Sequence, residues 1–342
     1  MKPLILLLFL MACGSAAPEN PQVTAGRDAY LRYCALCHGD AGQGYVADAA
    51  NALTNPYFLA AASDDFLRAA IVRGRPGTPM SPWGAALGGP LADAQVTQIL
   101  AFLRSYQTAP PFALADVHVG AGSAPRGQAI YDVECVGCHN AQGAGKPYMG
   151  IANPEFLATA SDAYLRAAIL HGRPGTPMPA YATAETDQGI DDLVVLIRSW
   201  QQSTIEGPSQ LPTQNLGQVV QNPQGPPPVF ASQTGRYVAA ADLKAALDAG
   251  ARLVILDARP PADYPNFHLP GAVSTPFYAV ADYLAQLPTD VQIVTYCACP
   301  HAESGQAADT LLASGYTTVK VLDEGILYWK SQGWPLHTGV LP

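Results

Sequence analysis

The sequence predicts a multidomain protein in which two all-α domains precede an α/β domain with a parallel sheet. Two observations predict the helical part: the pattern Cys-x-x-Cys-His occurs twice, and the segments that follow both copies repeat at a spacing of about one hundred residues. A third observation predicts the α/β part, because short apolar runs alternate with helical patterns beyond a stretch rich in Pro and Gly.

The two motif copies, at 34–38 and 135–139, have the form of c-type haem attachment sites. In such a site two thiols form thioether bonds to one haem, and the following histidine supplies an axial nitrogen to the iron. The sequence therefore predicts two haem c groups. The predicted thioether residues are Cys34, Cys37, Cys135 and Cys138, and the predicted axial histidines are His38 and His139.

A second axial ligand is predicted from a Gly-Thr-Pro-Met segment that follows each motif by about forty residues. It ends at Met80 in the first repeat and at Met178 in the second. A methionine can also fill a gap in a core, but these two occupy equivalent positions after a proline, and a thioether sulfur suits haem iron. His171 is a rival by proximity, yet its counterpart in the first repeat is Arg73, which argues against a shared ligand role.

Helical patterns flank both motifs. One helix is predicted before each motif and another closes each repeat, at 26–33, 127–133, 93–106 and 190–200. With these helices, the haem motif and the Met-bearing loop, both repeats resemble class I cytochrome c domains, which we place at 23–108 and 121–203. The resemblance implies that the terminal helices cross beside the haem and that the haems transfer single electrons.

The N-terminus has the pattern of an export signal: Lys2, an apolar run too short to span a bilayer, and small residues around Cys13. Residues 10–13 resemble the bacterial lipobox. The resemblance implies a lipoprotein signal peptide at 1–12, lipidation of Cys13 and a tether at 13–22, with a plain secretory signal as the alternative. We therefore expect a location in the bacterial periplasm, anchored by the lipid to the inner or the outer membrane.

The formal net charge of the chain is −9, which argues against nucleic acid as a partner. Haem attachment itself implies an exported protein. We expect the partners to be other periplasmic redox proteins, together with a small sulfur donor or acceptor and the membrane that holds the lipid.

Residues 204–231 are rich in Pro, Gly, Gln and Asn, and this composition predicts a partly extended linker that does not fold alone. An α/β domain is predicted from there to the C-terminus, at 232–340. Its expected strands are at 253–256, 291–296 and 319–322, and its expected helices are at 239–249, 279–287 and 303–314.

Several segments of this third domain resemble the rhodanese family. They are Asp257-Ala258-Arg259 after the first strand, His268-Leu269-Pro270-Gly271-Ala272, and the closing residues 325–335. The strand at 291–296 ends just before Cys297, where that family carries its catalytic cysteine. The resemblance implies a thiolate that accepts sulfur as a persulfide, and the loop amides and helix dipole beyond a strand end favour a thiolate.

The loop after Cys297 departs from the family pattern. Pro300 stands where the family usually has a Gly, and Glu303 takes the place of a basic residue. An acidic group there repels phosphate and arsenate, so we discount phosphatase and arsenate reductase activity. The missing basic residue also weakens the case for thiosulfate as the sulfur donor.

Three interpretations of Cys297, Cys299 and His301 are open. In the first, Cys297 is a nucleophile that accepts sulfur, His301 assists its ionisation, and Cys299 resolves the persulfide or forms a reversible disulfide. In the second, the three residues bind a soft metal such as Cu(I) or Zn(II), with His268 as a further ligand. In the third, the loop is inert and the domain docks a partner.

The sequence thus predicts a dihaem c-type cytochrome that transfers single electrons and carries a rhodanese-like thiol site. The hypothesis of an enzyme holds that this site accepts or oxidises a reduced sulfur species and that the haems take the electrons. The alternative is a pure electron carrier whose third domain docks a partner or senses a metal or a thiol.

Overall fold

A computed structural model of the chain describes residues 20–342, apart from residues 48, 205–206, 214 and 232. The predicted signal peptide and the predicted lipidation site, Cys13, lie outside the described residues. Among the described residues, no helix has both the length and the apolar character needed to cross a membrane.

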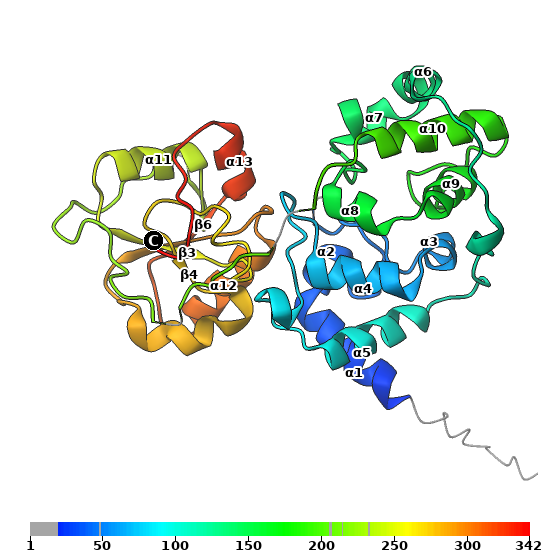
Figure 1. Cartoon of the computed structure of the whole chain (residues 1–342). Helices are drawn as coiled ribbons and strands as arrows, with labels where there is room; N and C mark the ends of the chain where they lie inside the picture. The colour runs from blue at the N-terminus through cyan, green and yellow to red at the C-terminus, as the bar shows by residue number, and fades with distance from the viewer. Residues whose placement is uncertain (1–19, 48, 205–206, 214, 232) are drawn as a thin grey trace, which may run out of the picture.

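Two helical domains lie one above the other on one side of the molecule, and the α/β domain lies on the other side (Figure 1). The first helical domain consists of α1 (Pro21–Tyr33), α2 (Ala35–His38), α3 (Pro56–Ala61), α4 (Asp64–Arg73) and α5 (Asp93–Arg104). The second consists of α6 (Ala124–Glu134), α7 (Val136–His139), α8 (Pro154–Thr159), α9 (Asp162–His171) and α10 (Asp187–Ser199).

In each helical domain the first helix crosses the last at a glycine. A Cβ atom on Gly26 of α1 would lie 1.9 Å from the carbonyl oxygen of Gln98, and one on Gly127 of α6 would lie 2.3 Å from that of Asp192. Only a residue without a side chain allows such an approach. The predicted crossing of the terminal helices is therefore confirmed. Helix α1 begins five residues before the predicted start, because Asn20 accepts a hydrogen bond from the amide of Gln22 and caps it.

The two helical domains pack against each other through equivalent residues. The side-chain amide of Asn55 donates to the carbonyl of Pro174 at 2.9 Å, and that of Asn153 donates to the carbonyl of Pro76 at 3.1 Å. Each asparagine also caps a helix, α3 or α8, through its side-chain oxygen. This reciprocal pair relates the two repeats by an approximate two-fold axis and brings both Met-bearing loops to the domain interface.

Aromatic and charged side chains fill that interface. The ring of Phe66 lies 4.6 Å from the ring of Tyr164. The guanidinium of Arg73 binds Glu155 at 2.6 Å, and the carboxylate side chain is only 2% exposed. A buried carboxylate is stable only when it is paired, so this ion pair ties the first domain to the second.

The α/β domain contains one sheet in the order β1-β2-β6-β5-β3-β4, in which five strands run parallel and β1 pairs antiparallel with β2. Its strands are β1 (Gln233–Thr234), β2 (Tyr237–Val238), β3 (Leu253–Asp257), β4 (Val273–Ser274), β5 (Gln292–Tyr296) and β6 (Val319–Leu322). Its α-helices are α11 (Ala240–Asp248), α12 (Ala302–Ala313) and α13 (Gly325–Ser331). The predicted fold class is confirmed, and β3 and β5 are buried throughout or nearly so, as predicted.

One expected α-helix has a different geometry. The segment predicted at 279–287 forms a 3-10 helix, η4 (Phe277–Gln286). Its buried residues are Phe277, Val280 and Tyr283, which recur every three residues. A 3-10 helix places residues i and i+3 above one another, so this spacing puts the three buried residues on one edge of the helix. In an α-helix the same three residues would not line up along one edge.

The second half of the predicted linker packs onto the α/β domain. Leu216 and Val219 are buried, and Gln221 pairs with Leu253 at the start of β3. The carbonyl of Pro226 accepts a hydrogen bond from the backbone amide of Arg252, which belongs to the α/β domain. The segment is extended, and it obtains its burial from the sheet beside it rather than from a core of its own.

Candidate haem and thiol sites

The two histidines of the motifs are oriented in the same way. The Nδ1 atom of His38 donates to the carbonyl of Asn51 at 2.8 Å, and that of His139 donates to the carbonyl of Met149 at 3.0 Å. Burial lowers the pKa of both imidazoles and favours the neutral form. A neutral ring that donates from Nδ1 keeps the Nε2 lone pair free, which is the form that binds a metal.

Each motif is fixed by the helix before it. The hydroxyl of Tyr30 in α1 donates to the carbonyl of Gly39 at 2.9 Å, and the hydroxyl of Tyr131 in α6 donates to that of Asn140 at 2.6 Å. Both acceptors directly follow the histidine. These bonds hold the short helices α2 and α7, and hence their cysteines, against the crossing helices.

The two methionines sit at the ends of identical turns. The hydroxyl of Thr78 donates to the carbonyl of Arg75 and accepts from the amide of Met80, at 2.7 and 3.1 Å. Thr176 makes the same two bonds around Met178, at 2.8 and 3.2 Å. The threonine in the repeated segment thus fixes the backbone from which each methionine side chain projects.

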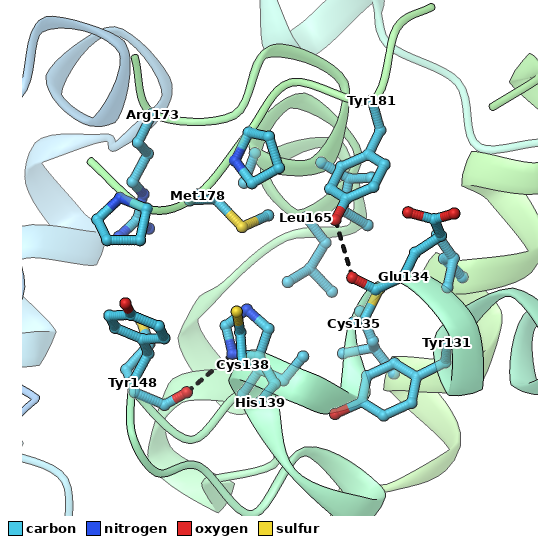
Figure 2. Close-up of a pocket in the computed structure, with 18 of the residues that line it drawn as sticks. Tyr131, Glu134, Cys135, Cys138, His139, Tyr148, Leu165, Arg173, Met178 and Tyr181 are labelled. Atoms are coloured by element: carbon cyan, nitrogen blue, oxygen red, sulfur yellow. Dashed lines mark hydrogen bonds between the residues drawn. The ribbon is translucent and has the colours of Figure 1, made fainter. Parts of the chain in front are cut away.

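In the second domain these groups surround one pocket. Figure 2 shows Met178 on one side of the pocket and His139 with Cys138 on the other. The hydroxyl of Tyr181, which also lines the pocket, donates to the carbonyl of Glu134 at 2.9 Å. Thiols, a histidine and a methionine around an otherwise apolar cavity are the donor set of haem c with His/Met ligation. Its further apolar lining includes Leu165, Ala168, Ile169, Leu193 and Ile197.

The first helical domain also contributes residues to the pocket of the second domain, and sequence reasoning missed this contribution. Tyr45 and Asn51 line it, and the ring of Tyr45 lies edge-on to that of Tyr148 at 6.0 Å. Asn51 is also the residue whose carbonyl holds His38. One residue of the first domain therefore contacts both predicted haem sites. The pattern of the single repeat contains no signal for such a contact.

The predicted thiol site lies at the end of β5 and is buried. The sulfur atoms of Cys297 and Cys299 are 3.6 Å apart, and the Cys297 thiol also donates to the carbonyl of Cys299 at 2.6 Å. The hydroxyl of Ser304 lies 3.2 Å from the Cys297 sulfur. A carboxylate oxygen of Glu303 and both sulfur atoms lie within 4.8 Å of one another. The third member of the cluster is thus Glu303.

Burial controls the protonation of this cluster. Burial and the neighbouring Cys299 raise the pKa of the Cys297 thiol well above its usual range, although Ser304 opposes the shift. Burial and the negative charge that Cys297 carries when ionised raise the pKa of Glu303 well above its usual range. The sequence-based expectation of a thiolate at Cys297 stays a prediction, which the burial of this thiol in the closed arrangement does not favour.

The structure does not bring His301 to the thiols. Its imidazole stacks on the ring of Tyr237 at 3.9 Å and its Nε2 binds Asp323 at 2.6 Å. His268 is also engaged elsewhere, since its two ring nitrogens bind the carbonyls of Tyr264 and Leu341. The proposed assistance by His301 stays a prediction that these contacts do not support.

The thiol loop lies against the first haem motif. The side chain of Cys299 interacts with that of Cys37, and helix α12 contacts helix α2. Around this contact, Arg32 donates to the carbonyl of Tyr278 at 3.2 Å, and the rings of Tyr33 and Tyr278 are 5.5 Å apart. The contact with the Cys297 sulfur lowers the pKa of Cys299, but the interaction with Cys37 and burial outweigh it and raise that pKa. Sequence reasoning missed this contact.

Fold and sites together define a c-type cytochrome joined to an α/β thiol domain. A family model described as cytochrome c oxidase, cbb3-type, subunit III matches residues 21–103 and 122–197, and a model described as rhodanese-like domain matches residues 239–332. The chain is therefore a fusion of cytochrome c domains, which are similar to the cbb3-type subunit III, with a C-terminal rhodanese-like domain. The cytochrome c domains imply haem c and electron transfer.

Three curated proteins are similar to parts of this chain. The chain is 28% identical over 197 residues to a cbb3-type cytochrome c oxidase subunit CcoP from Azospirillum sp., a match that covers 52% of this chain and 62% of that protein. It is 31% identical over 84 residues to a sulfurtransferase from Allochromatium vinosum, covering 25% of this chain and 78% of that protein. It is 34% identical over 87 residues to an HTH-type transcriptional regulator from Mycobacterium tuberculosis, covering 25% of this chain and 38% of that protein.

The chain thus spans less than two thirds of the length of the CcoP subunit and of the transcriptional regulator. Among solved structures, a chain of the Kuenenia stuttgartiensis reducing HAO-like protein complex is similar with a TM-score of 0.34 and 22% identity. That match covers 52% of this chain and 96% of the other.

Proposed function

We propose that this protein is a dihaem electron carrier that takes electrons from sulfide at the Cys297–Cys299 pair. The observation that carries the proposal is the contact between Cys299 and Cys37, which joins the thiol site to the first haem motif. The proposed axial ligands are His38 with Met80 and His139 with Met178. When bound, each haem supplies a one-electron acceptor.

The proposed chemistry begins with the thiol pair. Cys297 and Cys299 would lose two protons and two electrons and form a disulfide, and bound haem would supply the one-electron acceptors. Sulfide then attacks the Cys297 sulfur, the disulfide bond breaks, and Cys299 leaves as a thiolate. Cys297 now carries the sulfur as a persulfide. Transfer of that sulfur to an acceptor thiol restores the pair, so that sulfide and the acceptor thiol yield a persulfide, two protons and two electrons.

The surroundings of the pair favour sulfide over larger donors. Cys297 is fully buried and Cys299 is 2% exposed, so only a small molecule reaches them while the domains are docked. Glu303 takes the place where a basic residue would attract thiosulfate. Uncharged hydrogen sulfide meets both conditions, since it is small and is not repelled by a carboxylate.

A second candidate function is favoured by the same burial. Protonated, covered thiols are poor nucleophiles, and a rhodanese-like domain of this kind would serve as a docking module for a pure electron carrier. In both cases we propose export to the periplasm with a lipid on Cys13 and with other periplasmic redox proteins as electron partners.

The two functions are separated by mixing the ferric holoprotein with sulfide under anaerobic conditions and following haem reduction. We expect saturable reduction that slows at least tenfold, a loss of about 1.4 kcal/mol of transition-state stabilisation, when Cys297→Ser and Cys299→Ser are combined. The matched control is His301→Gln, on the same loop but bound to Asp323. An unchanged rate in the double variant would eliminate the sulfide-oxidising function and leave the electron carrier.

A further inference from the structure

One cluster in the α/β domain has the composition of a metal site. The sulfur atoms of Cys297 and Cys299 and a carboxylate oxygen of Glu303 lie within 4.8 Å of one another. The three residues are at most 4% exposed. Two come from the loop after β5 and the third from the first turn of α12, so a strand end and a helix start fix their positions.

The spacing of the two sulfur atoms fits one ion between them. Zinc binds thiolates at about 2.3 Å in tetrahedral geometry, which places two such sulfur atoms about 3.8 Å apart. The sulfur atoms of Cys297 and Cys299 are 3.6 Å apart. The loop therefore already holds the pair at the separation of two zinc ligands, whereas a disulfide requires about 2.0 Å.

Glu303 provides a second, independent indication of a ligand. Its Oε2 atom is buried and has no hydrogen-bond partner among the described residues. A buried polar oxygen without a partner costs free energy. The guanidinium of Arg259 donates to both carboxylate oxygens of Asp257 and does not donate to Oε2 of Glu303. A cation between Glu303 and the two sulfur atoms would satisfy the orphan oxygen.

We propose that Cys297, Cys299 and Glu303 form a zinc site. Two sulfur ligands and one carboxylate suit zinc better than Cu(I), which prefers sulfur alone. The fourth position is open to water. In this ligand set Glu303 takes the place of His301, which sequence reasoning considered. The imidazole of His301 binds Asp323 and stacks on Tyr237 instead.

Zinc binding regulates the thiol chemistry, and this consequence rests on the proposed function. A zinc ion holds both sulfur atoms as thiolates and blocks their approach to form a disulfide. Bound zinc therefore stops the oxidation step, and removal of zinc restores it. The domain would then deliver electrons from sulfide only in its zinc-free form.

The test uses the full-length holoprotein, stripped of loosely bound metal with a chelator, equilibrated with zinc chloride and desalted. Elemental analysis gives zinc relative to haem iron, and X-ray absorption at the zinc edge gives the ligands. We expect one zinc per chain with two sulfur neighbours at about 2.3 Å. Cys297→Ser with Cys299→Ser should abolish binding, Glu303→Gln should weaken it, and His301→Gln should leave it unchanged.

Absence of zinc from the wild-type protein, or a zinc spectrum without two sulfur neighbours, would overturn the site. Retention in the double serine variant would overturn it as well. Sulfide-dependent haem reduction is measured on the same samples with and without zinc. If zinc binds but the zinc-free protein is not reduced, the proposed function fails and the metal site stands. If reduction occurs but zinc does not bind, the metal site fails and the proposed function stands.

Discussion

The two predicted haem motifs share the pattern Cys-x-x-Cys-His but have different neighbours. Helix α2 of the first contacts α12 of the rhodanese-like domain, whereas the second borders Tyr45 and Asn51 of the first helical domain. Arg32 and Tyr33 precede the first motif and touch Tyr278, while at the equivalent place in the second repeat Val133 is 78% exposed. Residues that the repeats share build the predicted haem sites. Residues in which they differ select what each domain packs against.

The largest effect is expected from changes that disrupt the helix crossing shared by the two repeats. Gly26→Ala and Gly127→Ala place a methyl group within 1.9 and 2.3 Å of a facing carbonyl oxygen. We expect each change to lower the free energy of unfolding of its own domain by about 2–4 kcal/mol. The control is Gly137→Ala, where a Cβ atom meets nothing within 4 Å. Thermal unfolding followed by haem absorbance measures the loss, and equal stability of Gly26→Ala and the control would refute the crossing.

The next effect separates the two motifs. Tyr278→Ala removes the ring that packs on Tyr33 and should release the rhodanese-like domain from α2. Alkylation of Cys299, followed by mass spectrometry, should accelerate roughly tenfold, because burial limits the reaction of thiols. Val133→Ala, on the exposed counterpart surface, is the control. An unchanged alkylation rate in Tyr278→Ala would show that the domains are not held together there.

A smaller effect tests the reciprocal bonds between the helical domains. Asn55→Ala and Asn153→Ala each remove a helix cap and one hydrogen bond to the opposite domain. Loss of a cap costs about 1 kcal/mol, and we expect similar losses from both variants because the contacts are equivalent. Denaturant titration measures them. A large loss from one variant alone would contradict the approximate two-fold relation.

The smallest effect is a pH dependence confined to the rhodanese-like domain. The pKa of Cys297 is raised in the folded protein, so the folded chain holds this proton more tightly than the unfolded chain does. The resulting contribution to the free energy of unfolding is fully present below the unfolded pKa of about 8.5. Above that pH the unfolded chain loses the proton first, so the free energy of unfolding falls as pH rises. Denaturant titrations between pH 7 and 10 on the wild type and Cys297→Ser measure the slope, which should be shallower in the variant.

The sequence was sufficient for the features that depend on local pattern. Repeated segments predicted the paired helical domains, and buried runs predicted β3, β5 and β6. The features that it missed depend on contacts between distant segments. Glu303 joins the thiols because α12 begins beside β5, and Asn51 reaches the second pocket because the domains are paired. The difference between Arg32 and Val133 at equivalent positions was the available signal for docking.

The cover over Cys37 has a consequence for how the protein is made. Haem attachment requires access to the Cys37 thiol, and in the folded chain the rhodanese-like domain lies against it. The thiol of Cys37 is therefore most accessible before the rhodanese-like domain docks on α2. We expect haem attachment at the first motif to precede that docking.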